Sequence, residues 1–316
     1  MRTEILYRFT IGKPLKLPAG AFTPYKFEEA PAVISLNDYF DTEDPFNSYI
    51  FTQHQIQFNV NMDSSSKINS SYVTLYNVDE EVINFVTTNH NNNLVCILEA
   101  GDNEQGLKEI FKGTVTAAQK IDDTQDTQLK MNLADGAVNA KNAKTIRTYP
   151  RGTSYETILR DMNKDMKLPI SSFAGVEGRL LNPVTFAGST HQIMEKLSDT
   201  LGVSYSIQNG VTSIVPYRSY KKVEVSIITP TSGLIGNIKK GVDDSKSGKK
   251  SASMDSNSIQ FMCLLDGALK PNETVYVDDG DIVGPYKITS IKFSGDYEGN
   301  DWTCSVKAAK VEGVLE

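Results

Sequence analysis

Apolar and polar residues alternate over much of the first 135 residues of the chain. The segment QIQFNVNM, which starts at Gln55, carries its apolar side chains on one face, and SSYVTLYNV repeats the pattern after a polar turn. A period of two residues is typical of strands that bury one face. Residues 1–48 contain five prolines, which exclude a long helix, so we expect an extended arm with short strands there.

A helical period appears at three places. DEEVINFV at 79–86 predicts a short helix capped by Asp79, and GTSYETILRDMNKDM predicts a longer one capped by Thr153 or Ser154. A third helix is predicted behind Gly188, Ser189 and Thr190. The apolar positions of the last two helices lie 35 residues apart: Ile158, Leu159, Met162, Met166 and Leu168 correspond to Ile193, Met194, Leu197, Leu201 and Val203. Either an internal duplication or two ordinary capped amphipathic helices explains this spacing.

The strand pattern returns after residue 202. Asn209-Gly210 lies between two alternating runs and predicts a two-residue hairpin turn. Five further strand candidates follow, which favours a closed or nearly closed barrel because closure removes exposed edges. Residues 239–254 interrupt them, and the first twelve hold five lysines and two aspartates. This Lys/Ser-rich segment is predicted to be a mobile loop, which either orders on a partner or is a tolerated insertion.

The composition limits the classes of function that the chain can have. A length of 316 residues suits two or three domains, with 39% hydrophobic and 22% charged residues. The net charge of −7 argues against wrapping nucleic acid, although it suits a surface along which DNA slides without sticking. No apolar stretch reaches the length of a membrane span and no signal peptide is evident, so we expect neither membrane insertion nor secretion. The three cysteines and Trp302 stand in apolar strand contexts and are predicted to be buried.

Motifs for catalysis are not evident. The three histidines lack metal-ligand spacing, and the sequence contains no Cys-x-x-Cys, Gly-x-Ser-x-Gly, phosphate-loop or dinucleotide motif. The acidic group from Asp38 to Asp44 lacks the residue order of a calcium loop and is better explained as a solvated turn. We therefore predict that the chain is not an enzyme, with no catalytic, metal-binding or cofactor-binding residues, and that it serves assembly or binding.

Several segments resemble, in order, the baseplate hub family of contractile-tailed bacteriophages. The matching pieces are FNVNMDSSSKINSSYVTLYNVDEEVINFV, VCILEAGDNEQGLKEIFKGTVTAAQKI, GTSYETILRDM, TPTSGLIGNIKKG, FMCLLDGALKPNETVYV and GPYKITSIKFSGDYEGNDWTCSVKA. They extend over roughly residues 30–310. The chain departs from the family's pattern at Asn272, where the family favours Gly, and at Phe293-Ser294, where the family has His and one further residue.

The resemblance implies an α+β, mostly β fold with two tube-type β-barrel domains flanking a smaller α/β region with two helices. The implied domains are residues 1–120 (arm and first barrel), 121–220 (two helix-hairpin units) and 221–316 (second barrel with the mobile loop at 239–254). It also implies a structural virion protein of the tail baseplate, assembled in the host cytoplasm, that joins the tail tube to the central spike. Three copies would form a pseudo-sixfold ring around a DNA channel without binding the DNA specifically.

The implied partners are further copies of the chain, the tail tube protein, the central spike protein and other baseplate proteins. Two groups are expected to contact partners: the turn of Ser232, Gly233, Leu234, Ile235 and Gly236, and the loop lysines Lys239, Lys240, Lys246, Lys249 and Lys250. Two alternatives stay open. One is a carbohydrate-binding or carbohydrate-degrading phage tail protein, and the other is the spike hub of a secretion system.

Overall fold

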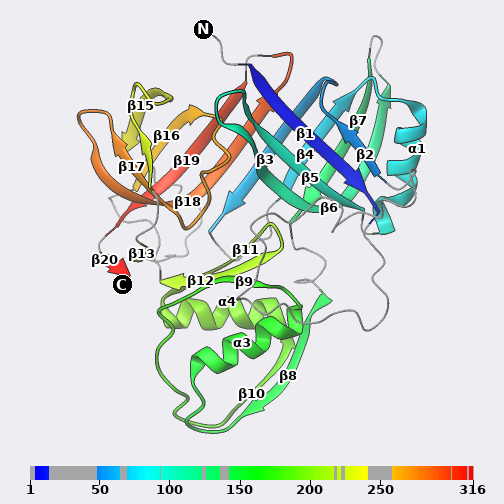
Figure 1. Cartoon of the computed structure of the whole chain (residues 1–316). Helices are drawn as coiled ribbons and strands as arrows, with labels where there is room; N and C mark the ends of the chain where they lie inside the picture. The colour runs from blue at the N-terminus through cyan, green and yellow to red at the C-terminus, as the bar shows by residue number, and fades with distance from the viewer. Residues whose placement is uncertain are drawn as a thin grey trace.

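The computed structural model describes residues 4–13, 48–64, 70–92, 94–122, 126–135, 142–216, 219–221, 225–240, 258–299, 301–311 and 313–315. These residues are mostly β, with three α-helices. In Figure 1 strands from both ends of the chain form one broad layer, and the middle of the chain lies below it as a smaller α/β region. The predicted α+β, mostly β class is confirmed.

The broad layer is one sheet of thirteen strands. The N-terminal strands are β1 (Ile5–Gly12), β2 (Ser48–Phe51), β3 (Ile56–Asp63), β4 (Ser70–Tyr76), β5 (Val95–Asp102), β6 (Gly106–Asp122) and β7 (Thr127–Ala134). The C-terminal strands are β14 (Ser226–Ile228), β15 (Leu234–Lys240), β16 (Ser258–Leu264), β17 (Thr274–Asp278), β18 (Val283–Asp296) and β19 (Trp302–Lys310). Between β4 and β5 lie the helix α1 (Glu80–Asn89) and the short 3₁₀ helix η3 (His90–Asn92).

The two ends of the chain meet at β3 and β18. The strand order is β15-β16-β19-β18-β3-β4-β7-β6-β5-β1-β2, with β17 beside β18 and β14 beside β17. We expected two tube-type β-barrel domains. They are not confirmed for the described residues, because the strands form one sheet whose path is not closed. Hydrophobic alternation locates strands but does not show which edge meets which, so the joint was not visible in the sequence.

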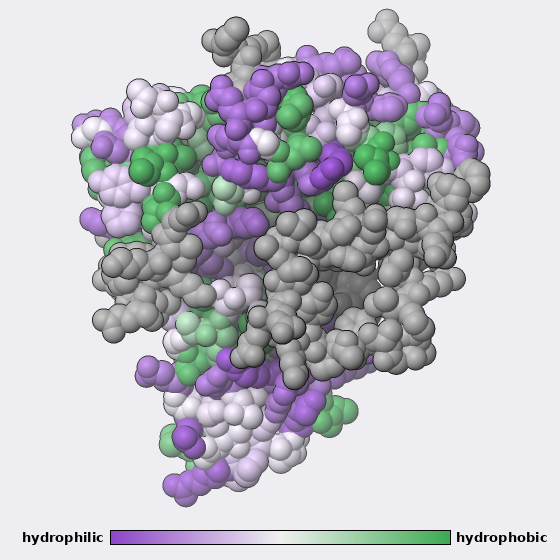
Figure 2. Space-filling model, viewed as in Figure 1, coloured by the Kyte–Doolittle hydropathy of each residue, from purple (hydrophilic) through white to green (hydrophobic). Residues whose placement is uncertain are grey.

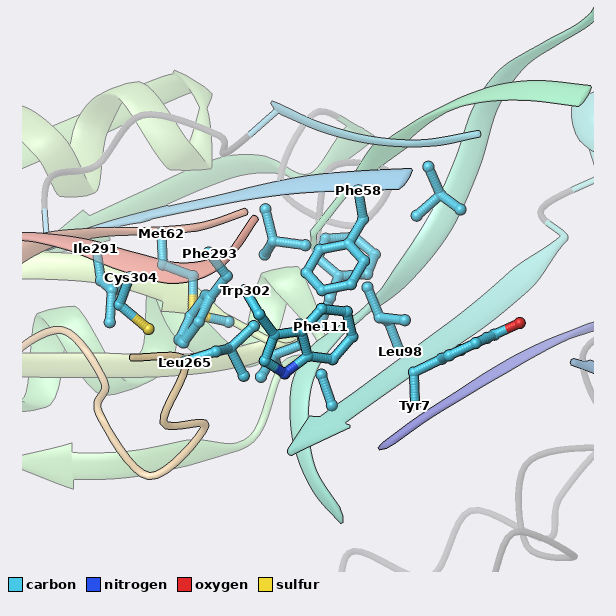
Figure 3. Close-up of a cluster of buried hydrophobic side chains, with 14 of the residues drawn as sticks. Tyr7, Phe58, Met62, Leu98, Phe111, Leu265, Ile291, Phe293, Trp302 and Cys304 are labelled. Carbon is cyan, nitrogen blue, oxygen red and sulfur yellow. The ribbon is translucent and has the colours of Figure 1, made fainter. Parts of the chain in front are cut away.

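One hydrophobic core runs beneath this joint. Phe58 on β3 packs edge-on against Trp302 on β19, with ring centroids 5.3 Å apart, and the indole nitrogen of Trp302 donates to the carbonyl of Gly101 at 3.2 Å. Figure 3 shows Phe58, Trp302, Phe293 and Leu98 side by side. All three cysteines and Trp302 are buried, as predicted. The N- and C-terminal parts therefore fold around shared side chains.

The α/β region has its own core. Its elements are β8 (Lys144–Tyr149), α3 (Tyr155–Met166), β9 (Ile170–Phe173), β10 (Val184–Ser189), α4 (Thr190–Leu201), β11 (Val203–Gln208) and β12 (Val211–Pro216). β8 pairs with β10, and β12 pairs with both β11 and β9. Two short strands, β13 (Ser219–Lys221) and β20 (Gly313–Leu315), pair with each other. We expected residues 121–220 to form this region, and β7, within that range, pairs in the large sheet instead.

The helices α3 and α4 keep the 35-residue spacing to the residue. Both span twelve residues, follow the N-caps Ser154 and Ser189, and end at the left-handed C-caps Lys167 and Gly202. The Ser154 hydroxyl accepts a hydrogen bond from the N–H of Thr157, while Ser189 makes no side-chain cap bond. The shared length and caps favour the duplication over a chance likeness of two helices.

The β11–β12 hairpin joins the α/β region to the large sheet. Asn209 and Gly210, both at positive φ, form the predicted two-residue turn. The buried carboxylate of Asp135, just after β7, accepts hydrogen bonds from both of their backbone N–H groups. The Asn209 side chain accepts from the Lys112 N–H at 3.0 Å and donates to Glu109 at 3.0 Å. Hydrogen bonds therefore hold the turn against the end of the large sheet.

Candidate interaction surface

A tight turn after β14 carries the first group of residues expected to contact partners. The Ser232 hydroxyl donates to the carbonyl of Ile227 at 2.8 Å and accepts from the N–H of Thr229 at 2.8 Å. Gly233, at a φ of 102°, then leads into β15, and its carbonyl accepts from the N–H of Leu264 at 2.9 Å. A side chain is rarely tolerated at such a φ. The turn is thus a rigid structure fixed against β16.

A bulge follows the turn. The β15–β16 register shifts between Ile235 and Lys239, and Gly236 within this interval has a φ of 70°. The extra residues turn Ile238 into the core, while Lys239 and Lys240 point to solvent. Bulges are common at the edges of sheets, where they bend the strand and redirect side chains. Among the described strands β15 pairs only with β16, so its outer edge is open.

Four large apolar side chains are exposed around this turn, and we call them the apolar surface: Ile227 (β14), Ile235 (β15), Met262 and Leu264 (β16). Ile235 and Met262 are cross-strand partners, and Leu264 lies over Gly233. Leu264 and Ile227 are each 59% exposed. In Figure 2 hydrophobic patches appear among hydrophilic residues on the side where Figure 1 places β15, β16 and β17. Clusters of this kind commonly mark protein interfaces.

The inner side of the same strands is packed core. Cys263 on β16 faces Cys304 on β19 across the sheet, and burial raises the pKa of the Cys304 thiol well above its ordinary value. A buried thiol of raised pKa reacts poorly because the thiolate is the nucleophile. The Cys304 thiol therefore belongs to the packed core, while Ile235, Met262 and Leu264 stay exposed on the outer side of these strands.

The structure brings together part of the predicted contact set. Ser232, Gly233, Leu234, Ile235 and Gly236 form the turn and the start of β15. Lys239 and Lys240 belong to β15, so the expectation of a loop starting at residue 239 was wrong for these two residues. The rest of that loop, with Lys246, Lys249 and Lys250, lies outside the described residues.

Sequence reasoning missed Ile227, Met262 and Leu264. A signal was present: SIQFMCLL ends in five consecutive apolar residues instead of alternating. An uninterrupted apolar run is typical of a strand covered on both faces. Apart from the burial of Cys263, we made no prediction of which residues of this run face outward. In the structure Phe261 and Cys263 point inward and Met262 and Leu264 point outward.

Two further observations bear on chemistry. Over the ranges that the structure describes, no three His, Cys, Asp or Glu side chains converge as a metal site would require. None of the helices in these ranges is long and apolar enough to span a membrane.

Comparison with solved structures finds the same fold in tail proteins of phage origin. The 43 kDa tail protein of prophage MuSo2 from Shewanella oneidensis is 12% identical, with a TM-score of 0.59, covering 83% of this chain and 94% of its own. A tail protein from Neisseria meningitidis MC58 is 8% identical, with a TM-score of 0.57 and the same coverages. At these identities the likeness establishes the fold alone. No protein-family model matches the sequence, and no curated protein matches it.

Secretion-system proteins share the fold as well. An E. coli component of the type VI secretion system, itself similar in structure to the T4 phage tail proteins gp27 and gp5, is 10% identical with a TM-score of 0.53. It covers 82% of this chain and 74% of its own. A chain of the PdpA–VgrG complex is 12% identical, also at 0.53, and covers 97% of this chain. The fold is thus common to phage tails and secretion spikes.

Proposed function

We propose that this chain is a structural, non-enzymatic baseplate hub that joins a tail tube to a central spike. The observation that carries the proposal is the fold, which matches 94% of the length of the MuSo2 tail protein. The ordered collinear motifs in the sequence support the hub in particular. The open edge of β15 and the apolar surface supply the protein contacts that such a role requires.

In this proposal three copies form a pseudo-sixfold ring, and tail tube, spike and other baseplate proteins bind around it. Ser232–Gly236, Lys239, Lys240, Lys246, Lys249 and Lys250 contact these partners. The genomic DNA passes through the ring without specific binding, which the net charge of −7 supports because like charges repel. The particle forms in the host cytoplasm and the protein resides in the virion.

Electron microscopy of tail particles tests the role directly. An antibody against this chain should label the tip of the tail, at the junction of tube and spike, and a map of that region should hold three copies. Labelling along the tube, or intact tails that lack the chain, would refute the hub assignment. A chain variant with a surface epitope at the exposed Glu104 turn gives an independent label.

The spike hub of a secretion system is a second candidate. The chain from the PdpA–VgrG complex covers more of this chain than the tail proteins do, and this chain spans 65% of its length. Both roles need the same ring, so the particle that carries the chain distinguishes them. Recovery of the chain with tail tube and capsid proteins favours the phage role, and recovery with secretion sheath proteins and no capsid favours the second.

A further inference from the structure

One strand order occurs twice in the large sheet. β1 and β3–β7 form a first β unit with the order β3-β4-β7-β6-β5-β1, and β14–β19 form a second β unit with the order β15-β16-β19-β18-β17-β14. Numbered within its unit, each order reads 2-3-6-5-4-1. The first four pairs of each order are antiparallel. The fifth pair differs: β1 is antiparallel to β5, whereas β14 is parallel to β17. The two units therefore share one strand order, and they differ only in the direction of the first strand.

One register shift recurs at a matching place in the two units, whereas the shifts in β5–β6 and β15–β16 have no counterpart. The β6–β7 register shifts at Thr116 and the β18–β19 register shifts at Thr289. At both shifts the threonine hydroxyl donates a 3.1 Å hydrogen bond to a carbonyl on the neighbouring strand, that of Asn132 or Lys307. A bulge is a specific departure from regular pairing. Its recurrence aligns β6 with β18 residue by residue, at an offset of 173.

Backbone bonds at the ends of the strands extend the alignment. The N–H of Tyr76 donates to Gln55 at 3.1 Å, and the N–H of Leu264 donates to Gly233 at 2.9 Å. Likewise, Val115 bonds to Leu94 and Ile288 bonds to Glu273, each at 2.9 Å. These bonds equate β4 with β16 and β5 with β17. They also place the start of β15 where β3 starts in the first unit.

The units are joined inside the chain by the second strand of one and the fifth strand of the other. β3 pairs antiparallel with β18, from Gln57 opposite Asp296 to Asp63 opposite Ser290. β17 and β3 pair one after the other along the same edge of β18, while β19 pairs along its opposite edge. At the internal joint β3 therefore pairs with the part of β18 that extends beyond the end of β17.

The equivalent edges are open. β15, the counterpart of β3, pairs only with β16 among the described strands. Thr114 on β6 pairs with β5 on one edge and β7 on the other, and β5 reaches no farther. Within the described part of the chain no strand pairs with Ala117–Asp122 of β6 on the β5 side. The helices η3 and α1 contact β6, while Ala117, Gln119 and Asp122 stay exposed. These two edges are the counterparts of the edges that meet in the internal joint between β3 and β18.

We propose that β15 of one copy pairs antiparallel with Ala117–Asp122 of β6 in a second copy, which repeats the internal β3–β18 joint between chains. The proposal rests on the hub function, because it names the self-contact of that ring. Two different surfaces meet, so the contact is heterologous, and it closes into a ring when the rotation between units is that of the internal joint. Every second joint in the ring then lies within a chain.

Charge supports this partner. The β15 edge carries Lys239 and Lys240, while β6 ends in Asp122, beside the exposed first-turn Glu80 and Glu81 of α1. Lys120, the one cation on this part of β6, is already bonded to Glu80 at 3.0 Å and to Asp122 at 3.4 Å. Positive and negative edges of this kind attract and fix the register.

The apolar surface supports it as well. In the first unit the positions of Ile235 and Leu264 are held by Gln57 and Tyr76, and the Tyr76 hydroxyl donates to Gln57 at 2.8 Å. Gln57 in turn donates to Asp296 across the internal joint at 2.9 Å. The second unit replaces this polar bridge by aliphatic side chains, which gain stability only when a partner covers them.

Disulfide cross-linking of the assembled protein tests the pairing. At the internal joint Asn59 faces Ser294, and the equivalent pair between chains is Lys239 and Ile121. The K239C/I121C variant should form disulfides between chains on mild oxidation, giving a ladder that stops at one closed species. The three native cysteines are buried and should stay reduced. The K239C/K292C variant, whose second site is exposed on β18, should give no ladder.

An edge variant gives a second measurement without oxidation. I235E places a charge in the apolar surface, and I146E places the same charge at the 81% exposed Ile146 of β8. Sedimentation should show at least tenfold weaker self-association for I235E and unchanged association for I146E. Oligomers that form without the 239–121 disulfide overturn the proposed pairing and leave the hub in place. Tails that lack the chain refute the hub itself, whatever the cross-links show.

Discussion

The carboxylate of Asp135 accepts a 2.6 Å hydrogen bond from the backbone N–H of Gly210, 75 residues later in the chain. The pair lies where the α/β region meets the large sheet, and Asp135 is only 2% exposed. Burial raises the pKa of this carboxyl to about 7, against the opposing effect of the two backbone hydrogen bonds. The attachment of the region to the sheet therefore responds to pH.

The stability of the protein should fall as the pH rises from 5 to 8. The ordinary pKa of Asp135 is 3.8, so between pH 4 and 7 the folded state binds more protons than the unfolded state, and the free energy of unfolding decreases with pH. The expected decrease is on the order of 2 kcal/mol. Urea unfolding at four pH values measures it. In D135N the slope should flatten, and an equal slope in both proteins would contradict this assignment.

At higher pH the titration of Lys287 should change the free energy of unfolding in the opposite direction. Its ammonium is buried and donates to the carbonyl of Pro216 at 2.8 Å, and burial lowers its pKa from 10.5 to about 8. Between these values the unfolded state binds more protons, so the free energy of unfolding rises with pH. The K287M variant should lose this rise, on the order of 2 kcal/mol between pH 8 and 10. K292M, at an exposed position on the same strand, is the control and should keep it.

The joint between β3 and β18 should not accept a side chain at Gly295. A Cβ there would collide with the ring of Phe58, which faces Gly295 across the joint. Overpacking of this kind costs about 1–3 kcal/mol, so G295A should lower the denaturation midpoint clearly. S294A, one residue away, loses only a 3.4 Å hydrogen bond to Asn59 and should change the stability by less than about 1 kcal/mol. Equal effects would mean that the ring of Phe58 moves freely aside.

The two helix caps should differ in strength. Ser154 accepts a hydrogen bond from the N–H of Thr157 at 3.2 Å, whereas Ser189 makes no such bond. S154A should destabilise the protein by about 1 kcal/mol, and S189A by less than half of that. Thermal unfolding of the two variants side by side measures the difference. The reverse order would show that the two helices are capped differently in solution.

Local structure followed from the sequence wherever one periodicity dominated. Asn209-Gly210 fixed a hairpin, and the apolar positions of α3 and α4 fixed both helices together with their 35-residue spacing. These features depend on neighbours within a few residues, and so a single sequence reveals them.

The pairing of strands that are distant in the sequence could not be predicted from the sequence. The opposition of Asn59 and Ser294 across the joint depends on which sheet edges are free, and a strand pattern shows faces rather than edges. Part of the candidate surface was predicted. The turn at Ser232 was expected from the family resemblance, whereas no prediction was made for Met262 and Leu264, because inward and outward apolar residues look alike in an uninterrupted run.

The joint of β3 with β18 has a consequence for biosynthesis. Gln57 and Asp296 are 239 residues apart, and ribosomes add about 5–20 residues per second, so the edge of β3 waits tens of seconds for its partner strand. During that interval nascent chains on one polysome hold identical unsatisfied edges close together. A C-terminally truncated product would keep this edge bare permanently, and it should aggregate or recruit chaperones while the full-length chain stays in solution.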